Sequence, residues 1–245
     1  MNVNKVATLR NSRGGAVPGV VEAARTCLEA GAPGITVHPR ADERHVRPAD
    51  VEAIAALIGE WRASGRAAEY NIEGDPRPDF LALVARVRPD QCTLVPVRPG
   101  EITSQAGWPV ATSTTEIGGI VRELQAAGTR VSLFVDPEAD AMRWAAACGA
   151  DRVELYTEPF ARAFEAGRAA GEASFARYAA AARLAHELGL GVNAGHDLDL
   201  DNLELFRTLP HLDEVSIGHA LISRALWVGL ATVVREYLDV LAGRG

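Results

Sequence analysis

Short β-branched apolar runs alternate along the chain with longer segments rich in Ala, Leu, Glu and Arg. The short runs predict strands, which we place near 2–7, 34–38, 68–73, 91–95, 130–135, 151–156, 190–194 and 213–217. The longer segments predict helices near 17–31, 48–64, 77–87, 115–127, 137–148, 158–188, 200–208 and 220–242. Glycine follows several of these helices, as at Gly128 and Gly189, and glycine is a common helix terminator.

Eight strand–helix units predict a parallel sheet, and eight such units close naturally into an α/β fold, the (β/α)₈ TIM barrel with extra helices. No linker-like segment divides the chain, so we expect one domain over 1–245. A doubly wound open sheet is the alternative, but the first predicted strand lacks a Gly-x-Gly-x-x-Gly turn.

Two predicted helices have unusual features. The segment 158–188 is too long for one barrel helix, and we expect Gly167 and Gly171 to divide it. The helix near 220–242 is apolar over much of its surface. That surface either meets another subunit or packs in the core.

Composition narrows the possible functions. The chain has 245 residues, is 48% hydrophobic and has a net charge of −7, which argues against a general nucleic-acid binder. No apolar run is long enough to span a membrane. Cys27, Cys92 and Cys148 form no Cys-x-x-Cys pair. This pattern is typical of a reducing cytoplasm and favours neither a disulfide framework nor a zinc knuckle.

Candidate chemistry gathers at the predicted strand ends. Barrel active sites lie at the C-terminal ends of the strands, where this chain places the following residues: Arg10, Arg13, His38, Arg40, His45, Glu73, Arg98, Glu101, Thr103, Glu154, His196, Asp197, Gly218 and His219. Nearly every strand therefore delivers a titratable or anion-binding residue to one rim. Arginine presents a planar fork to phosphate, and histidine changes protonation near neutral pH.

Each residue also has an ordinary explanation as a surface or strand-end charge. Glu154 lies within an apolar run, where burial would raise the pKa of its carboxyl and favour acid–base work. The Gly-His pairs after the last two strands occupy the usual phosphate site of a barrel. We assign His186 and His211, by contrast, to surface or packing roles.

A metal site is the main rival explanation for histidines and carboxylates at a barrel rim. No His-x-His follows the first strand, and no helix carries two ligands at i, i+4 spacing, so we expect neither metal nor organic cofactor. Lys5 is the chain's one lysine, and nothing in the sequence supports a covalent role for it. The loop near Val97 to Trp108 has Gly100 and Gly107 as hinges for a lid.

In these residues the chain resembles the pyridoxine 5′-phosphate synthase family, essentially end to end. The resemblance rests on several motifs in the same order: Ala7 to Gly14, Gly34 to His38, Arg40, His45, Asn71 to Glu73, Leu94 to Pro96, Thr103, Val131 to Phe134, Glu154, Val192 to His196 and Ile217 to His219. It implies a (β/α)₈ barrel, usually a homooctamer, that acts as a transferase-type ring-forming synthase in vitamin B6 biosynthesis. The family condenses 1-deoxy-D-xylulose 5-phosphate with 3-amino-2-oxopropyl phosphate to pyridoxine 5′-phosphate, phosphate and water, without metal or cofactor.

The resemblance also implies roles for individual residues. His38 and Glu73 match the general bases, His196 the proton donor and Glu154 the carboxylate that stabilises the transition state. Three residues match family positions that contact the deoxyxylulose phosphate: Arg40, His45 and Thr103. Five match positions around the aminoketone phosphate: Asn2, Arg13, Asp197, Gly218 and His219.

Three positions depart from the common family pattern. Asn4 and Lys5 replace an Asp-His pair, which leaves donors but removes a carboxylate and an imidazole, and Asp197 stands where glycine also occurs. Two other functions remain open: a barrel aldolase or isomerase acting on another sugar phosphate, and a non-catalytic phosphate-binding or scaffold barrel.

Overall fold

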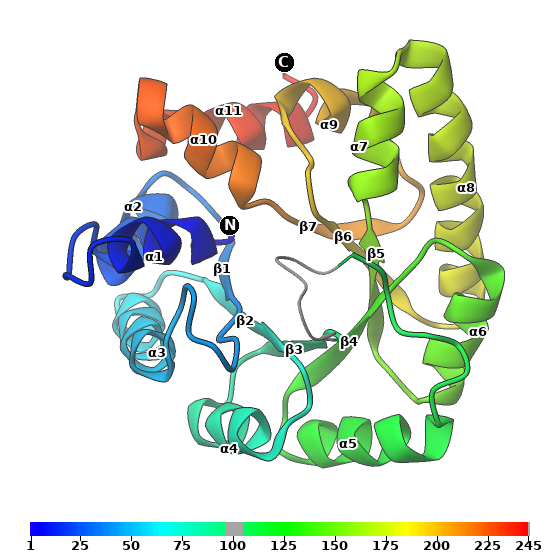
Figure 1. Ribbon diagram of the computed structural model, residues 1–245, viewed down its shortest axis with the longest axis horizontal. Helices are drawn as coiled ribbons and strands as arrows, with labels where there is room; N and C mark the ends of the chain where they lie inside the picture. Colours follow the sequence, from blue (N-terminus) through cyan, green and yellow to red (C-terminus); the bar gives the residue numbers. More distant parts are fainter. Residues whose placement is uncertain (97–104, 245) are drawn as a thin grey trace.

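The strands form a nearly closed parallel barrel with the helices around it (Figure 1). The computed structural model describes residues 1–96 and 105–244. Its seven strands are hydrogen-bonded in chain order: β1 (Gly34–Val37), β2 (Glu69–Gly74), β3 (Gln91–Leu94), β4 (Arg130–Val135), β5 (Arg152–Tyr156), β6 (Gly191–Gly195) and β7 (Leu212–Ser216). The TIM-barrel prediction is therefore confirmed, and these strands match the last seven predicted ones to within two residues.

Two helices precede β1, and the others follow the strands; together they surround the barrel (Figure 1). Their bounds are α1 (Asn4–Asn11), α2 (Val20–Glu29), α3 (Pro48–Ala63), α4 (Pro78–Val87), α5 (Thr114–Ala126), α6 (Ala139–Ala147), α7 (Glu158–Glu165), α8 (Arg168–Glu187), α9 (Leu200–Phe206), α10 (His219–Val228) and α11 (Leu230–Leu241).

The predicted strand over 2–7 is wrong, because helix α1 begins at Asn4. The extended backbone before it nevertheless fills the gap between β7 and β1. The Asn2 N–H donates to the Ile217 carbonyl at 2.9 Å, and the Thr36 N–H donates to the Met1 carbonyl at 2.8 Å. These bonds satisfy edge groups that an open sheet would leave unpaired, and they carry the chain straight into a helix at the rim.

Two long predicted helices are broken where glycine adopts a left-handed backbone. Gly167 (φ 138°) separates α7 from α8, and Gly229 (φ 84°) separates α10 from α11. The expected break at Gly171 is wrong, because that residue lies buried inside α8. An added Cβ there would lie 2.8 Å from Phe164 of α7, so Gly171 serves close packing rather than helix termination.

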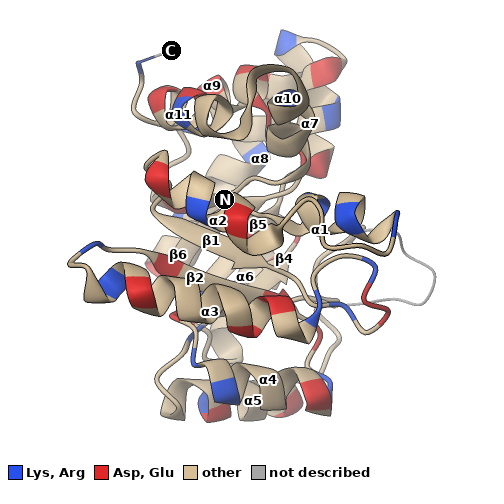
Figure 2. Cartoon of the chain, turned by 90° about the vertical axis from the view of Figure 1, so that its left-hand side faces the viewer, with Lys and Arg blue, Asp and Glu red and all other residues tan. Residues whose placement is uncertain are grey.

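Apolar stripes attach the helices to the barrel. In α2 the buried residues follow i, i+3, i+4, i+7 and i+8 spacing, which places them on one face of a helix. Helix α11 repeats the pattern through Val233, Val234, Tyr237 and Val240 and packs on α2. The outer helix faces carry mixed charges, with basic and acidic residues close together along α3 (Figure 2).

No helix among the described residues is long and apolar enough to cross a membrane. Cys27, Cys92 and Cys148 are buried free thiols.

Candidate active site

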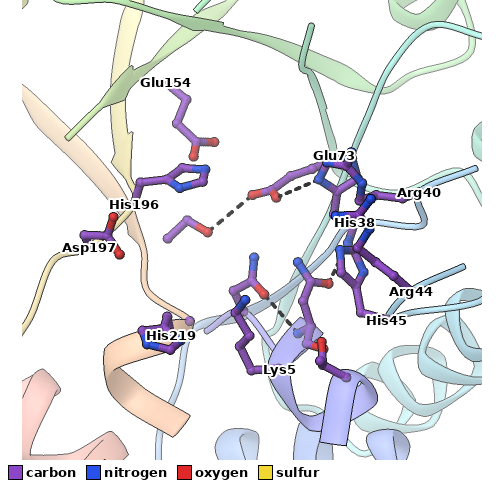
Figure 3. Close-up of a pocket in the computed structure, with 15 residues that line it drawn as sticks. Lys5, His38, Arg40, Arg44, His45, Glu73, Glu154, His196, Asp197 and His219 are labelled. Atoms are coloured by element: carbon purple, nitrogen blue, oxygen red, sulfur yellow. Dashed lines mark hydrogen bonds and ion pairs between the residues drawn. The ribbon is translucent and has the colours of Figure 1, made fainter. Parts of the chain in front are cut away.

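A cavity of about 380 Å³ opens at the C-terminal ends of the strands (Figure 3). This volume falls within the range of small-molecule sites. The lining residues are largely polar: Asn2, Asn4, Lys5, Thr8, His38, Arg40, Arg44, His45, Glu73, Glu154, His196, Asp197, Ser216, Gly218 and His219. The residues come from almost the whole length of the chain, and the barrel brings them together.

Two buried carboxyl groups, Glu73 at the end of β2 and Glu154 within β5, face this cavity. Burial is the main reason that the pKa of Glu73 rises to about 7, although the Ser216 hydroxyl, which donates to Glu73 Oε1 at 3.4 Å, opposes the rise. Burial and the nearby Glu73 charge also raise the pKa of Glu154 well above its usual value. The pair therefore holds protons at neutral pH that exposed carboxyls would have lost.

His38 follows β1 and faces Glu73, with its Nδ1 atom 3.9 Å from Glu73 Oε2. Its backbone N–H donates to Asn4 Oδ1 at 2.9 Å, and this bond links the residue to α1. Burial lowers the pKa of His38 well below its usual value, and electrostatic interactions with His45 and Arg40 lower it further. The His38 ring is therefore neutral at neutral pH and can accept a proton through one nitrogen.

His45 lies edge-on to His38, with ring centroids 5.8 Å apart. Burial, followed by the charges of Arg40 and Lys5, lowers the pKa of His45 to about 4. Among the described residues, His38 Nε2 and His45 Nδ1 have no hydrogen-bond partner. Buried polar atoms normally have partners, so both nitrogens are positioned to bond to a bound molecule.

His196 sits on a strained turn directly after β6. Both His196 (φ 87°) and Asp197 (φ 57°) adopt the left-handed backbone region, which costs non-glycine residues roughly 1–3 kcal/mol each. Hydrogen bonds hold the turn: Thr157 donates through its hydroxyl to the carbonyls of Gly195 and His196, and Asn202 Nδ2 donates to the Asp197 carbonyl at 3.0 Å. The surrounding structure thus forces the imidazole into the cavity.

Aromatic rings form one wall beside this imidazole. The ring centroids of Phe134 and Tyr156 lie 5.3 and 5.4 Å from that of His196. Burial lowers the pKa of His196, while the Asp197 carboxylate raises it. An added Cβ on Gly195 would lie 2.4 Å from Glu154 Oε1. Glycine at this position therefore allows the β6 backbone to approach the Glu154 carboxyl closely.

Helix α1 supplies another wall through Asn4, Lys5 and Thr8, which occupy i, i+1 and i+4 positions on neighbouring faces of the helix. Asn2 precedes it and accepts a hydrogen bond from the Asn4 N–H through its side chain at 3.0 Å. An added Cβ on Gly218 would lie 3.2 Å from the Asn2 side chain. The turn before α10 therefore packs against the start of the chain.

Cations line the side of the cavity that holds His38 and His45. Arg40 is buried, and its Nε lies 4.0 Å from Asp42 Oδ1. Arg44 is partly exposed and pairs with Asp42 at 2.5 Å. The two guanidinium groups thus lie around one carboxylate beside the cavity, where they contribute positive potential in an acidic protein.

The structure brings together most of the residues expected from the sequence. His38, Glu73, Glu154 and His196 meet in the cavity, and so do Arg40, His45, Asp197, Gly218, His219, Asn2, Asn4 and Lys5. Arg13 is exposed and does not line the cavity. Thr103, with Arg98, Glu101 and most of the expected lid, lies outside the described residues.

Arg10 is directed elsewhere. Its guanidinium forms two hydrogen bonds with the Asp50 carboxylate, at 2.5 and 2.8 Å. Asp50 also accepts the Arg47 N–H at the start of α3. Arg10 thus joins α1 to α3 and, like Arg13, does not line the cavity.

Three lining residues were missed: Thr8, Arg44 and Ser216. The helical period of α1 would have placed Thr8 with Asn4. Arg44 lies within the same cationic loop as Arg40. Ser216 directly precedes Ile217 and the Gly218-His219 pair. Among the described residues, no group of three or more His, Cys, Asp or Glu side chains could hold a metal ion.

Comparison with known proteins matches residues 1–243 to the family described as pyridoxal phosphate biosynthesis protein PdxJ. Proteins named pyridoxine 5′-phosphate synthase are about half identical to the chain. The one from Porphyromonas gingivalis is 49% identical over 243 residues, covering 99% of this chain and 98% of that protein. The one from Bacteroides fragilis is 51% identical over 242 residues, covering 98% of each.

Solved structures with similar folds have little sequence identity. Phosphoribosyl anthranilate isomerase from Thermotoga maritima has a TM-score of 0.59 at 11% identity, covering 91% of this chain and 94% of that chain. The isomerase of the same name from Thermus thermophilus has a TM-score of 0.55 at 16% identity, with the same coverage. Such likeness shows the fold alone.

Proposed function

This chain belongs to the family of the pyridoxal phosphate biosynthesis protein PdxJ, and on that premise we propose that it condenses 1-deoxy-D-xylulose 5-phosphate with 3-amino-2-oxopropyl phosphate. The products are pyridoxine 5′-phosphate, inorganic phosphate and water. The observation that carries the proposal is the convergence of two buried carboxyls and two histidines, Glu73, Glu154, His38 and His196, on one cavity.

Proton transfer by side chains explains why such a set is needed. Condensation of an amine with a ketone, loss of phosphate and ring closure each move protons on one bound skeleton. Glu73, whose pKa is about 7, can exchange protons in both directions near neutral pH. We assign it and the neutral His38 as the general bases. We assign Glu154 to stabilise charge that develops on the skeleton.

We assign His196 as the proton donor. Burial lowers the pKa of His196 and favours its neutral form, so donation requires prior protonation. Two bound phosphate groups bring negative charge close to the imidazole, which raises its pKa and favours the imidazolium. Substrate binding would thereby protonate His196 before it donates its proton.

Two phosphate groups need two cationic or N–H-rich sites. We assign the deoxyxylulose phosphate to Arg40 and His45, together with Thr103. We assign the aminoketone phosphate to the Gly218-His219 turn, Asn2 and Asp197, where the N-terminus of α10 offers backbone N–H groups. Arg13 is exposed and does not line the cavity, so its contact with the aminoketone phosphate would require movement of the loop after α1.

We further propose a metal-independent enzyme that works in the cytoplasm as a homo-oligomer, an octamer by resemblance. The free buried thiols favour a reducing compartment. The end of α10 leaves Trp227 86% and Leu226 67% exposed, and apolar side chains exposed together often mark subunit contacts. Light scattering of the purified protein would measure the assembly.

Assays with each phosphate alone and with both together test the reaction. We expect pyridoxine 5′-phosphate, identified by mass spectrometry, only in the mixture. Conversion of the sugar phosphate without the aminoketone would instead indicate an aldolase or isomerase. Binding of both phosphates without turnover would indicate a binding barrel.

A further inference from the structure

Lys5 is the chain's one lysine, and it lines the cavity that holds Glu73, Glu154 and His196. Figure 3 shows it rising from α1 between His219 and His45. Its charge lowers the pKa of both His45 and His196, so its Nζ atom lies near both. A primary amine thus stands between the two proposed phosphate sites.

The amine is not tied to an acidic partner. No carboxylate of the described residues forms an ion pair with Lys5. Arg10 and Arg44, by contrast, are each paired with an aspartate. The cavity lining around it contains both arginines, Arg40 and Arg44, and carboxyl groups, none of which is paired with Lys5. The neutral form of a primary amine is the nucleophilic form.

The chemistry of the proposed product suggests what such an amine would capture. The family is described by pyridoxal phosphate biosynthesis, whereas its named members are synthases of pyridoxine 5′-phosphate. Pyridoxal phosphate differs from pyridoxine phosphate by two hydrogens, because an aldehyde replaces one hydroxymethyl group. A cavity that forms and releases the alcohol must also have room for this aldehyde.

We propose that Lys5 captures pyridoxal 5′-phosphate as an imine in the catalytic cavity, which makes the cavity a reversible covalent binding site for the aldehyde end product. This inference rests on the proposed function. In the reaction the neutral Nζ attacks the aldehyde carbon, and the C–N bond forms as the C=O π bond breaks. The resulting carbinolamine loses its oxygen as water, leaving a C=N bond. Water reverses each step.

Such an adduct would occupy the cavity and exclude both substrates. The enzyme would then be inhibited when the aldehyde accumulates and released when it is consumed. Lys5 is the one lysine that lines the cavity, so it is the side chain there that can form an imine with an aldehyde.

The test uses the full-length protein and pyridoxal 5′-phosphate, followed by borohydride reduction, digestion and peptide mass spectrometry. We expect nearly stoichiometric labelling of Lys5 and protection of it by excess pyridoxine 5′-phosphate. Total labelling should fall roughly ten-fold in K5R, because arginine keeps the charge but has no nucleophilic amine. K5H is the second variant, and thermal unfolding checks that both fold. The α-amino group of Met1 is an internal control, because it is partly buried and donates to the Gly34 carbonyl.

The outcomes separate this inference from the proposed function, because turnover is measured on the same preparation. Labelling of Met1 instead of Lys5, or none at all in a preparation that turns over, would overturn the inference and leave the reaction intact. Labelling of Lys5 that excess pyridoxine 5′-phosphate does not reduce would also overturn it. Protected labelling of Lys5 without turnover would support the aldehyde site and count against the synthase.

Discussion

Replacing Glu73 by glutamine should stabilise the folded protein at alkaline pH while removing most of its turnover. The pKa of the Glu73 carboxyl is about 7, against an ordinary value of 4.5, and burial is the main cause. Because the folded value is the higher one, folding favours the protonated form. Above pH 7 the folded protein must hold a buried carboxylate, and this cost lowers the free energy of unfolding.

The size of the effect follows from the two pKa values. Each pKa unit corresponds to about 1.4 kcal/mol, so the penalty above pH 7 is roughly 3 kcal/mol, a large fraction of typical stability. Below the unfolded pKa the carboxyl is protonated in both states, and the penalty disappears. Glutamine keeps the shape and stays neutral. The stability difference between E73Q and the wild type should therefore rise from near zero at pH 4 to roughly 3 kcal/mol at pH 8.

Urea unfolding from pH 4 to pH 9 measures this difference, and turnover is measured on the same samples. Loss of the base should lower kcat by roughly 10²–10⁴-fold. Glu123→Gln, an exposed glutamate on α5, is the matched control and should change neither quantity. A stability difference that is independent of pH would refute the burial argument. Near-normal turnover in E73Q would remove Glu73 from the mechanism.

Other variants test neighbouring parts of the site. Arg40→Lys replaces a planar fork by a point charge and should raise KM for the deoxyxylulose phosphate more than for the aminoketone; equal increases would contradict the assignment. Ser216→Ala removes the hydroxyl that opposes the raised pKa of Glu73, so the acidic limb of the kcat profile should move to higher pH; an unmoved limb would show that this contact does not tune the base. Gly195→Ala places a Cβ against Glu154 Oε1 and should lower kcat at least ten-fold through displacement of that carboxyl; a fully active variant would show that Glu154 tolerates movement.

The sequence predicts most of the barrel because seven strands carry clear apolar runs between helix-forming segments. The first element fails for a physical reason. Val3, Val6 and Ala7 are all buried, and over so short a stretch an apolar pattern does not distinguish a strand from a helix. Gly229 was missed as a break because apolar residues continue on both sides of it.

Much of the site follows from the barrel rule alone, because His38, Glu73 and His196 come at strand ends and Glu154 lies within a strand. Side-chain contacts between residues far apart in the sequence cannot be predicted from the barrel rule. Arg10 pairs with Asp50, forty residues later, and this ion pair makes Arg10 unavailable to phosphate. Nothing in the local sequence indicates the pairing. Nor does local sequence show that Thr157 holds the strained His196 turn, because that contact depends on the register of β5 and β6.

The most direct test of the central claim is product formation from the two phosphates under single-turnover conditions with a metal chelator present. We predict that pyridoxine 5′-phosphate, identified by mass spectrometry, forms at the same rate with and without chelator. Absence of this product from folded protein supplied with both phosphates would contradict the proposed reaction. A rate that falls with chelator and recovers on addition of a divalent cation would contradict acid–base catalysis without metal.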